Sequence, residues 1–263
     1  MVKRRNLSTR AFGAEPGIPD VAVLAAWIAD HRGTPADIIT YLLDQSLTPQ
    51  LAAGIISPCA GGRFYKNRIM ECLAGVKESR VTSEIHLNPH AIIEDAAGIV
   101  LQKKGTSCAL PAPHLLGITD TYYHDNEEWN GAITGVYRDL MRSMRDTGIK
   151  GHVLVCKEIH EPEIESLVRP NIFVFQPEPD RESLACLMEH QHQIAVGRDY
   201  VDTVLSLSSE YDLRKIIIVD PDKESIERAL ECLDPDQVSA GGYCTDTGTD
   251  YWKNLVDTAV YTR

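Results

Sequence analysis

The sequence predicts an α/β protein built on parallel strands, most simply a (β/α)8 barrel with helices at its N-terminus. Short apolar runs recur through the second half of the chain at a nearly constant interval. They begin at Val153, Ile172, Ile194, Ile216 and Val238, which gives steps of 19, 22, 22 and 22 residues. Segments with helical spacing of apolar residues separate these runs. Continuous β-branched runs that alternate with short helices are typical of parallel strands covered on both faces.

The length and composition are those of an ordinary globular protein. A chain of 263 residues with 43% hydrophobic content fits one α/β domain, or a barrel with an appended segment. We expect residues 1–50 to form an N-terminal tail and helices that pack on the barrel. Residues 51–263 would then form the parallel β/α domain.

The charge and the cysteines limit the partners and the compartment. The net charge of -12 would repel phosphates, so we expect no nucleic-acid partner. No apolar run approaches the roughly 20 residues of a spanning helix, and the N-terminus lacks the apolar core of a signal peptide. Seven scattered cysteines, an odd number, do not form a disulfide framework. These features predict a cytoplasmic protein with no membrane association.

The first third of the chain reads as mostly helical. Residues 1–17 are polar and are predicted to pack loosely. Three helical stretches follow, beginning near Asp20, Thr34 and Thr48. Proline follows each of the two threonines, and proline suits the first turn of a helix. This part therefore predicts helices that cover the barrel from outside.

The middle of the chain alternates helices with two short candidate strands. Its longest helix has a capping-box signal, an aspartate with a glutamate three residues later. The predicted elements are a helix at 65–77, a strand at 83–87, a helix at 89–103, a strand at 107–110, and a helix that starts at Asp125 with Glu128 and ends at Gly148.

The number of strands distinguishes two architectures. The five regular runs and the two middle strands make seven, and residues 54–57 would supply the eighth. Eight units match a (β/α)8 barrel, whose typical length of about 250 residues also fits. The alternative is an open, doubly wound parallel sheet with a helical N-terminal subdomain.

Either architecture places ligands at the carboxyl ends of the strands. Ionisable residues follow each of the first four regular runs. Among them, Glu158 and Asp220 are the candidate general bases, because partial burial would raise the pKa of either carboxyl toward neutrality.

The same rule selects residues that would bind a small anionic substrate. Lys157 and Arg198 supply positive charge after two of the runs. Gly241, Gly242 and Tyr243 follow the last run, where a pair of glycines lets backbone N–H groups approach an anion closely. The other interpretations are a plain tight turn for the glycines and a surface ion pair for Arg198.

Three histidines are candidate ligands for a zinc-like divalent metal. His86 and His90 flank the end of the first middle strand, and His114 follows the second. Three imidazoles could hold such an ion with one position open for water. The alternative is that they are ordinary loop and capping histidines.

Two segments resemble the uroporphyrinogen decarboxylase superfamily, which includes cobalamin-linked methyltransferases built on (β/α)8 barrels. The first covers residues 68–81, and the second joins residues 241–244 to residues 254–259. In the methyltransferase branch, the resemblance implies a zinc ion that activates a thiol and is held by a His-x-Cys and a later cysteine. Cys244 matches the later cysteine and Cys156 the first one, but Leu154 stands where the histidine belongs.

We therefore expect an enzyme that acts on a small anionic metabolite, as a metal-assisted lyase, a hydrolase or a methyltransferase. The sequence contains no dinucleotide fingerprint, P-loop, nucleophile elbow or Cys-x-x-Cys. The alternative is a non-catalytic accessory protein that uses the barrel as a scaffold. Its N-terminal helices would then bind a protein partner or a second copy of the chain.

Overall fold

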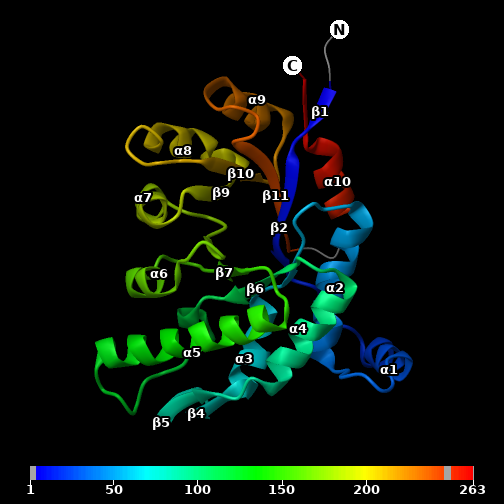
Figure 1. The fold of residues 1–263 in the computed structure, drawn as a ribbon, viewed down its shortest axis with the longest axis vertical. Coiled ribbons are helices and arrows are strands. Elements are labelled where there is room, and N and C mark those ends of the chain that lie inside the picture. The colour runs from blue at the N-terminus through cyan, green and yellow to red at the C-terminus, as the bar shows by residue number, and fades with distance from the viewer. Residues whose placement is uncertain (1–3, 246–249, 263) are drawn as a thin grey trace.

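Eight parallel strands form two four-stranded sheets in the computed structural model, which describes residues 4–245 and 250–262 (Figure 1). One sheet has the order β2-β11-β10-β9 and the other has the order β3-β6-β7-β8. The strands are β2 (Ser8–Ala14), β3 (Cys59–Gly61), β6 (Ser107–Pro111), β7 (His152–Val155), β8 (Ile172–Phe175), β9 (Gln193–Gly197), β10 (Lys215–Val219) and β11 (Val238–Cys244). The five regular runs of the sequence are thus confirmed as β7 to β11, all parallel to their neighbours.

The two sheets join where β2 meets the segment before β3. Arg10 and Ser57 form a parallel bridge. Ser57 donates its N–H to the carbonyl of Thr9 at 3.0 Å, and its own carbonyl accepts from Ala11 at 3.0 Å. This bridge joins the two sheets into one series of eight strands, which runs from β9 at one outer edge to β8 at the other.

The outer edges β8 and β9 do not pair with each other in the described part of the chain. Instead, the side-chain amide of Gln191 donates to the carbonyl of Val174 at 3.0 Å and accepts from its N–H at 3.0 Å. The fold is thus a mixed α/β arrangement of parallel sheets, and no closed barrel forms within the described residues. The open parallel sheet named as the alternative is compatible with this pattern.

The helices lie outside the sheets, and α5 to α9 follow each other along one side in Figure 1. The longest, α5, begins where Asp125 accepts hydrogen bonds from the N–H groups of Glu127 and Glu128, and it ends at Gly148, as expected. No helix in the described ranges is long and apolar enough to cross a membrane. The helices are α1 (Val21–Asp30), α2 (Ile38–Ala53), α3 (Lys66–Cys72), α4 (His90–Gln102), α5 (Asn126–Thr147), α6 (Glu161–Leu167), α7 (Arg181–His190), α8 (Val201–Leu207), α9 (Lys223–Cys232) and α10 (Tyr251–Thr258).

The N-terminal prediction is wrong in an important respect. Residues 1–17 were expected to pack loosely, but Ser8–Ala14 is strand β2, paired with β11 inside the sheet. Phe12 on this strand is fully buried. The parallel sheets therefore use residues on both sides of the boundary expected at residue 50. Nor does Thr48 start a helix, since it lies inside α2.

The segment from 65 to 87 also differs from the prediction. The helix ends at Cys72, and the chain continues as β4 (Leu73–Lys77), which pairs antiparallel with β5 (Arg80–Leu87). At Gly75 the backbone is left-handed, and a Cβ atom there would lie 2.4 Å from the carbonyl oxygen of Glu84. This close approach requires glycine at the point where the register of the hairpin shifts, between Ala74 and Val76. The strand predicted at 83–87 exists, but it belongs to this hairpin and not to the parallel sheets.

Two further corrections complete the strand count. The strand expected at 54–57 lies slightly later, as β3. Ser57 forms only an isolated bridge, to Arg10 of β2. The first and last described segments, β1 (Arg4–Asn6) and β12 (Val260–Thr262), pair antiparallel outside the parallel sheets.

Aromatic side chains fill the space between the two sheets. The ring of Phe12 on β2 stacks on Phe175 of β8 at 4.7 Å between centroids, and Phe173 lies 5.3 Å away. Gly241 makes room for this ring, because a Cβ atom there would lie 2.8 Å from Phe12 and 2.7 Å from Ile217. The two sheets thus face a common interior.

We predict that Gly241→Ala lowers the free energy of unfolding by about 1–3 kcal/mol, because the added methyl group overpacks two stiff side chains. Urea denaturation would measure the change. Gly98→Ala is the matched control, since its Cβ would meet no atom within 4 Å. In the middle of α4 it should raise the free energy of unfolding by about 1 kcal/mol. A neutral Gly241→Ala would contradict the packing described here.

Candidate active site at the carboxyl ends of the strands

A chain of hydrogen-bonded residues lies where β2, β3, β10 and β11 end. Glu15 Oε1 accepts from the hydroxyl of Tyr243 and, at 3.1 Å, from Nε of Arg63. Tyr251 donates its hydroxyl to Asp220 Oδ1 at 2.5 Å and accepts the backbone N–H of Tyr243 at 2.9 Å. We call these five residues the rim cluster.

The ends of β2 and β3 hold Glu15 and Arg63 together. The N–H of Glu15 donates to the carbonyl of Cys244 at 2.7 Å, and its carboxylate accepts the N–H of Arg63 at 2.7 Å. Gly62 lets the two strand ends meet, because a Cβ atom there would lie 2.1 Å from the carbonyl oxygen of Ala14. Backbone groups of Arg63 and Cys244 therefore hold Glu15 in position, in addition to the side chains that bind its carboxylate.

Asp220 has an unusual backbone as well as an unusual environment. Its φ of 51° lies in the left-handed region, which aspartate tolerates better than most residues. Burial raises the pKa of its carboxyl, while the hydroxyl of Tyr251 and the charge of Arg198 partly offset this rise. A carboxyl that keeps its proton to higher pH is better matched to general acid–base work near neutrality.

The two tyrosines act as fixed hydrogen-bond donors. Burial, together with the neighbouring Glu15, raises the pKa of Tyr243 above its usual range. Burial and Asp220 have the same effect on the pKa of Tyr251. Both hydroxyls therefore stay protonated at neutral pH and hold the carboxylates in place.

The structure brings three of the predicted site residues together. Asp220 and Tyr243 belong to the rim cluster, and Arg198 lies close enough to lower the pKa of Asp220. The guanidinium of Arg198 is half-exposed, and its Nη1 lies 3.7 Å from Asp222 Oδ2.

The other two charged predictions lie apart from the rim cluster. Lys157 and Glu158 follow β7 and are exposed. Their side chains form no hydrogen bond or ion pair with any described residue. The backbone carbonyl of Lys157 accepts from Gln176 at 3.2 Å. Glu158 as a base and Lys157 as an anion ligand therefore stay predictions.

The two glycines of β11 have a packing role. Gly241 accommodates Phe12 on the inner face, and a Cβ atom at Gly242 would lie 2.9 Å from the hydroxyl of Tyr251 and 2.9 Å from Trp252. Helix α10 can therefore press against the outer face of the strand. Anion binding by this pair stays a prediction.

The three candidate metal histidines are not brought together. His86 lies on the hairpin with its ring 3.9 Å from Glu84, and His90 starts α4 with its ring 3.7 Å from Glu94. His114 is partly buried against Glu163. Among the residues that the structure describes, no group of three or more His, Cys, Asp or Glu side chains is placed to hold an ion. These histidines do not fit a shared zinc-like ion, because the hairpin carries His86 away from the parallel sheets.

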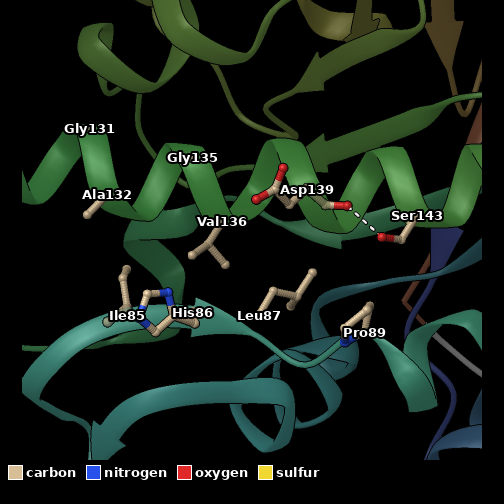
Figure 2. A pocket seen from close by; sticks show the side chains of 10 residues that line it. All are labelled: Ile85, His86, Leu87, Pro89, Gly131, Ala132, Gly135, Val136, Asp139 and Ser143. Carbon is tan, nitrogen blue, oxygen red and sulfur yellow. Dashed lines mark hydrogen bonds between the residues drawn. The ribbon is translucent and has the colours of Figure 1, made fainter.

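His86 borders a cavity between the hairpin and α5, shown in Figure 2. The cavity has a volume of about 380 Å³. Asp139 and Ser143 face it from α5, and the hydroxyl of Ser143 donates to the carbonyl of Asp139 at 2.9 Å. This cavity lies on the outside of the sheets, away from the rim cluster.

His114 and Glu163 form a partly buried pair. Glu163 accepts the N–H of His114 at 2.8 Å with one oxygen and contacts Nδ1 at 2.8 Å with the other. His114, Glu163 and Cys156 line one small cavity of about 10 Å³. Burial, together with the charge of Glu163, raises the pKa of the Cys156 thiol to about 12. The metal-ligand role that the superfamily resemblance implies for Cys156 stays a prediction.

Glu15, Arg63 and Tyr251 were missed by the sequence analysis. Glu15 directly follows β2, so the rule that selected Asp220 would have selected it once residues 8–14 were recognised as a strand. Arg63 follows β3 in the same way. Tyr251 begins α10, and no signal in the sequence points to its contact with Asp220.

We predict that Tyr251→Phe raises the pKa of Asp220 further, because the hydrogen bond that lowers it is lost. A ¹³C NMR titration of the carboxyl carbon would measure this change. Tyr243→Phe is the matched control, because its hydroxyl donates to Glu15. It should leave the Asp220 pKa unchanged.

The same shift affects stability. The folded protein holds the Asp220 proton more tightly than an exposed aspartate would. The resulting stability is therefore present below the unfolded pKa and lost as the pH rises through the folded pKa. In Tyr251→Phe that loss should move to higher pH, and an unmoved titration would contradict the proposed contact.

Comparisons with known proteins show a shared fold without a family. No protein-family model matches the sequence, and no curated protein matches it. Two solved structures are similar over almost their whole length. One is a putative vitamin-B12-independent methionine synthase from Listeria monocytogenes, with a TM-score of 0.55, 14% identity, and coverage of 97% of this chain and 98% of that one. The other is a B12-independent methionine synthase from Shewanella sp. W3-18-1 in complex with selenomethionine, with a TM-score of 0.54, 13% identity, and coverage of 97% and 95%. At this identity the likeness shows that this chain has the fold of these proteins, while the superfamily suggested by the sequence stays a prediction.

Proposed function

We propose that this chain is an enzyme that acts on a small anionic metabolite at the rim cluster and catalyses one-carbon transfer. The observation that carries this proposal is the hydrogen-bonded chain from Arg63 through Glu15, Tyr243 and Tyr251 to Asp220. It joins a carboxyl of raised pKa to a half-exposed guanidinium at the ends of four parallel strands.

Each residue of the rim cluster would have a distinct role. Asp220 would act as the general base and Tyr251 would orient it. Arg63 and Arg198, each about half exposed, would bind the negative charge of the substrate. Glu15 and Tyr243 would hold Arg63 in position. Glu158 is the second candidate base, on the strand end of β7.

We interpret the fold as a (β/α)8 barrel left open between β8 and β9. Around the interior, the strands follow the order of the chain, and β11 returns to pair with β2. Phe12 on β2 reaches Phe173 and Phe175 on β8, so the sheets curve toward each other. In such a barrel the carboxyl ends surround one mouth, and Glu158 and Lys157 would face the rim cluster across it.

The similar structures favour methyl transfer over the lyase and hydrolase alternatives. Both are described as methionine synthases, and one contains selenomethionine. An α-amino acid carries the carboxylate that Arg63 could bind, which fits an anionic substrate. Methyl transfer to a thiol would also give Cys244, at the end of β11, a role to test.

We predict that L-methionine and selenomethionine bind this protein. Arg63→Met should weaken the binding about tenfold or more, since a charge-assisted hydrogen bond contributes roughly 1.5–3 kcal/mol. Isothermal titration calorimetry would measure it. Arg32→Met, an exposed arginine outside the rim cluster, is the matched control.

A second measurement locates the ligand. Selenomethionine should perturb the NMR signals of Tyr243, Tyr251 and the neighbouring Trp252. Asp220→Asn should keep the binding, and in an assay for the methyl-transfer product it should lose turnover. Equal affinity of the wild type and Arg63→Met, or signals that move only elsewhere, would contradict the proposed site.

One observation favours a second function, an accessory protein that presents its N-terminal helices. Residues 21–29 of α1 are all apolar, yet no residue of the helix is buried. Val21 is 85% exposed and Ile18 just before it is 83% exposed. In Figure 1, α1 projects from the side of the molecule beside α2. A helix that is apolar all round is normally covered.

We infer that α1 would pack against α1 of a second copy of this chain. No charged residue lies between Val21 and Ala29, so two such helices can meet without repulsion despite the acidic charge of the protein. The alanines at 22, 25, 26 and 29 would allow the backbones to approach closely.

We predict that the double variant Val21→Glu/Ile28→Glu converts a dimer to a monomer, because it places charges in the interface. Size-exclusion chromatography with light scattering would measure the mass. Leu101→Glu is the matched control, since Leu101 is 87% exposed on α4. A wild-type protein that is monomeric at high concentration would exclude this interface.

A further inference from the structure

A cavity of about 740 Å³ opens at the amino ends of the strands, opposite the rim cluster. Its lining is rich in basic side chains and contains no carboxylate among the described residues. The basic lining residues are Arg10, Lys150, Arg169, His190, His192 and Arg214. In a protein with a net charge of -12, such a lining is the reverse of the surface average.

Arg10 is the innermost of these cations. It lies on β2 two residues before Phe12, with its guanidinium 4.5 Å from the ring centroid of Phe173 and 5.1 Å from that of Phe12. Burial lowers its pKa, although the side chain remains charged. Its hydrogen-bonding partner is the neutral Gln193, at 3.4 Å.

This guanidinium has no carboxylate partner among the described residues. Arg10 is only partly exposed, and a charge that is partly withdrawn from water is costly unless an opposite charge or several hydrogen bonds compensate it. One long hydrogen bond and two ring faces leave most of the five N–H donors of Arg10 unused. The two aromatic rings pack against the guanidinium of Arg10, which lines the cavity.

Two further lining residues, His152 and Lys150, carry N–H groups without an acidic partner among the described residues. His152 is only 2% exposed, and neither of its ring nitrogens has a partner. Burial and the charge of Arg145 lower its pKa to about 3, so the ring is neutral and carries one N–H donor. The ammonium group of Lys150, at the cavity mouth, forms no ion pair with any described residue.

The remaining cations are already engaged and would act at longer range. Arg214 and His192 share Asp212, at 3.1 Å and 3.4 Å. Arg169 donates to the carbonyls of Glu165 and Val168. Among the described residues, Arg10 and Lys150 are therefore the two cations in the lining that neither pair with a carboxylate nor contact a backbone carbonyl.

We propose that this cavity is a binding site for a small oxyanion that carries at least two negative charges, either a phosphate or a polycarboxylate. Arg10 is its main ligand, and Lys150 is the second. The site is independent of the proposed function. Arg10 lies on β2 and Glu15 directly follows this strand, and five residues correspond to about 17 Å along an extended chain.

Titration with inorganic phosphate and with citrate, at constant ionic strength, tests the proposal and distinguishes the two chemical sources. We expect one of these anions to bind to the wild type. Arg10→Met keeps the aliphatic stem against Phe12 and Phe173 and should weaken this binding at least about tenfold. Lys150→Met should weaken it less, because Lys150 lies at the mouth.

Three controls make the result decisive. Arg10→Lys keeps the charge and should retain part of the binding, which separates recognition from misfolding; circular dichroism of each variant checks the fold. Lys104→Met, an exposed lysine outside the cavity, should bind as the wild type does. Arg63→Met in the rim cluster should also leave phosphate and citrate binding unchanged.

Three outcomes would overturn the proposal. They are no binding of either anion to the wild type, equal affinity in a folded Arg10→Met variant, and an equal loss in Lys104→Met. If Arg63→Met alone abolished the binding, the anion would belong to the rim cluster. Failure of methionine binding at that cluster would leave the cavity site intact, so the two proposals fail separately.

Discussion

The ring of Phe12 links the two halves of this fold. It lies on β2, the strand that joins both sheets, and stacks on Phe175 at the far edge of the other sheet. The ring has room only because Gly241 carries no side chain. The positions of the flanking residues follow from it: Arg10 precedes Phe12 by two residues, and Glu15 follows it by three. One buried aromatic side chain therefore positions groups at both ends of the strands.

The two ends of the strands differ in how their charges are compensated. At the carboxyl ends, each carboxylate has a tyrosine hydroxyl and an arginine near it. At the amino ends, Arg10 has only a neutral amide and aromatic rings. A compensated group is preorganised for proton transfer because its geometry is already fixed. An uncompensated group attracts an anion instead, since the ligand supplies the missing charge.

The sequence predicted the part of the fold in which burial leaves a clear pattern. Strands β7 to β10 are covered on both faces, so their apolar runs are nearly continuous. Strand β2 was missed because Ser8, Thr9 and Arg10 are polar, although Thr9 is buried and accepts the N–H of Ile56. Strand β3 contains only a cysteine, an alanine and a glycine, which carry no β-strand signal.

The sequence predicts a site residue only where it also predicts the strand that the residue follows. Asp220, Arg198 and Tyr243 followed from the rule that parallel strands present ligands at their carboxyl ends. The partners of these residues come from β2 and α10, which are close in space and distant in sequence. The metal prediction depended on placing residues 83–87 in the parallel sheet. Because residues 73–87 form an antiparallel hairpin instead, the spacing of the histidines does not describe a site.

Three features of this structure do not favour the stability of the isolated chain. An arginine without a counter-ion, a buried histidine without a partner and an apolar helix without a cover each lower the free energy of unfolding. The interior shows the opposite, with closely packed aromatic rings and glycines placed where a methyl group would collide. Natural sequences depart from good packing and pairing mainly where a ligand or a partner restores it. For this reason the cavity beside Arg10 and the surface of α1 are better explained by what binds there than by the isolated chain.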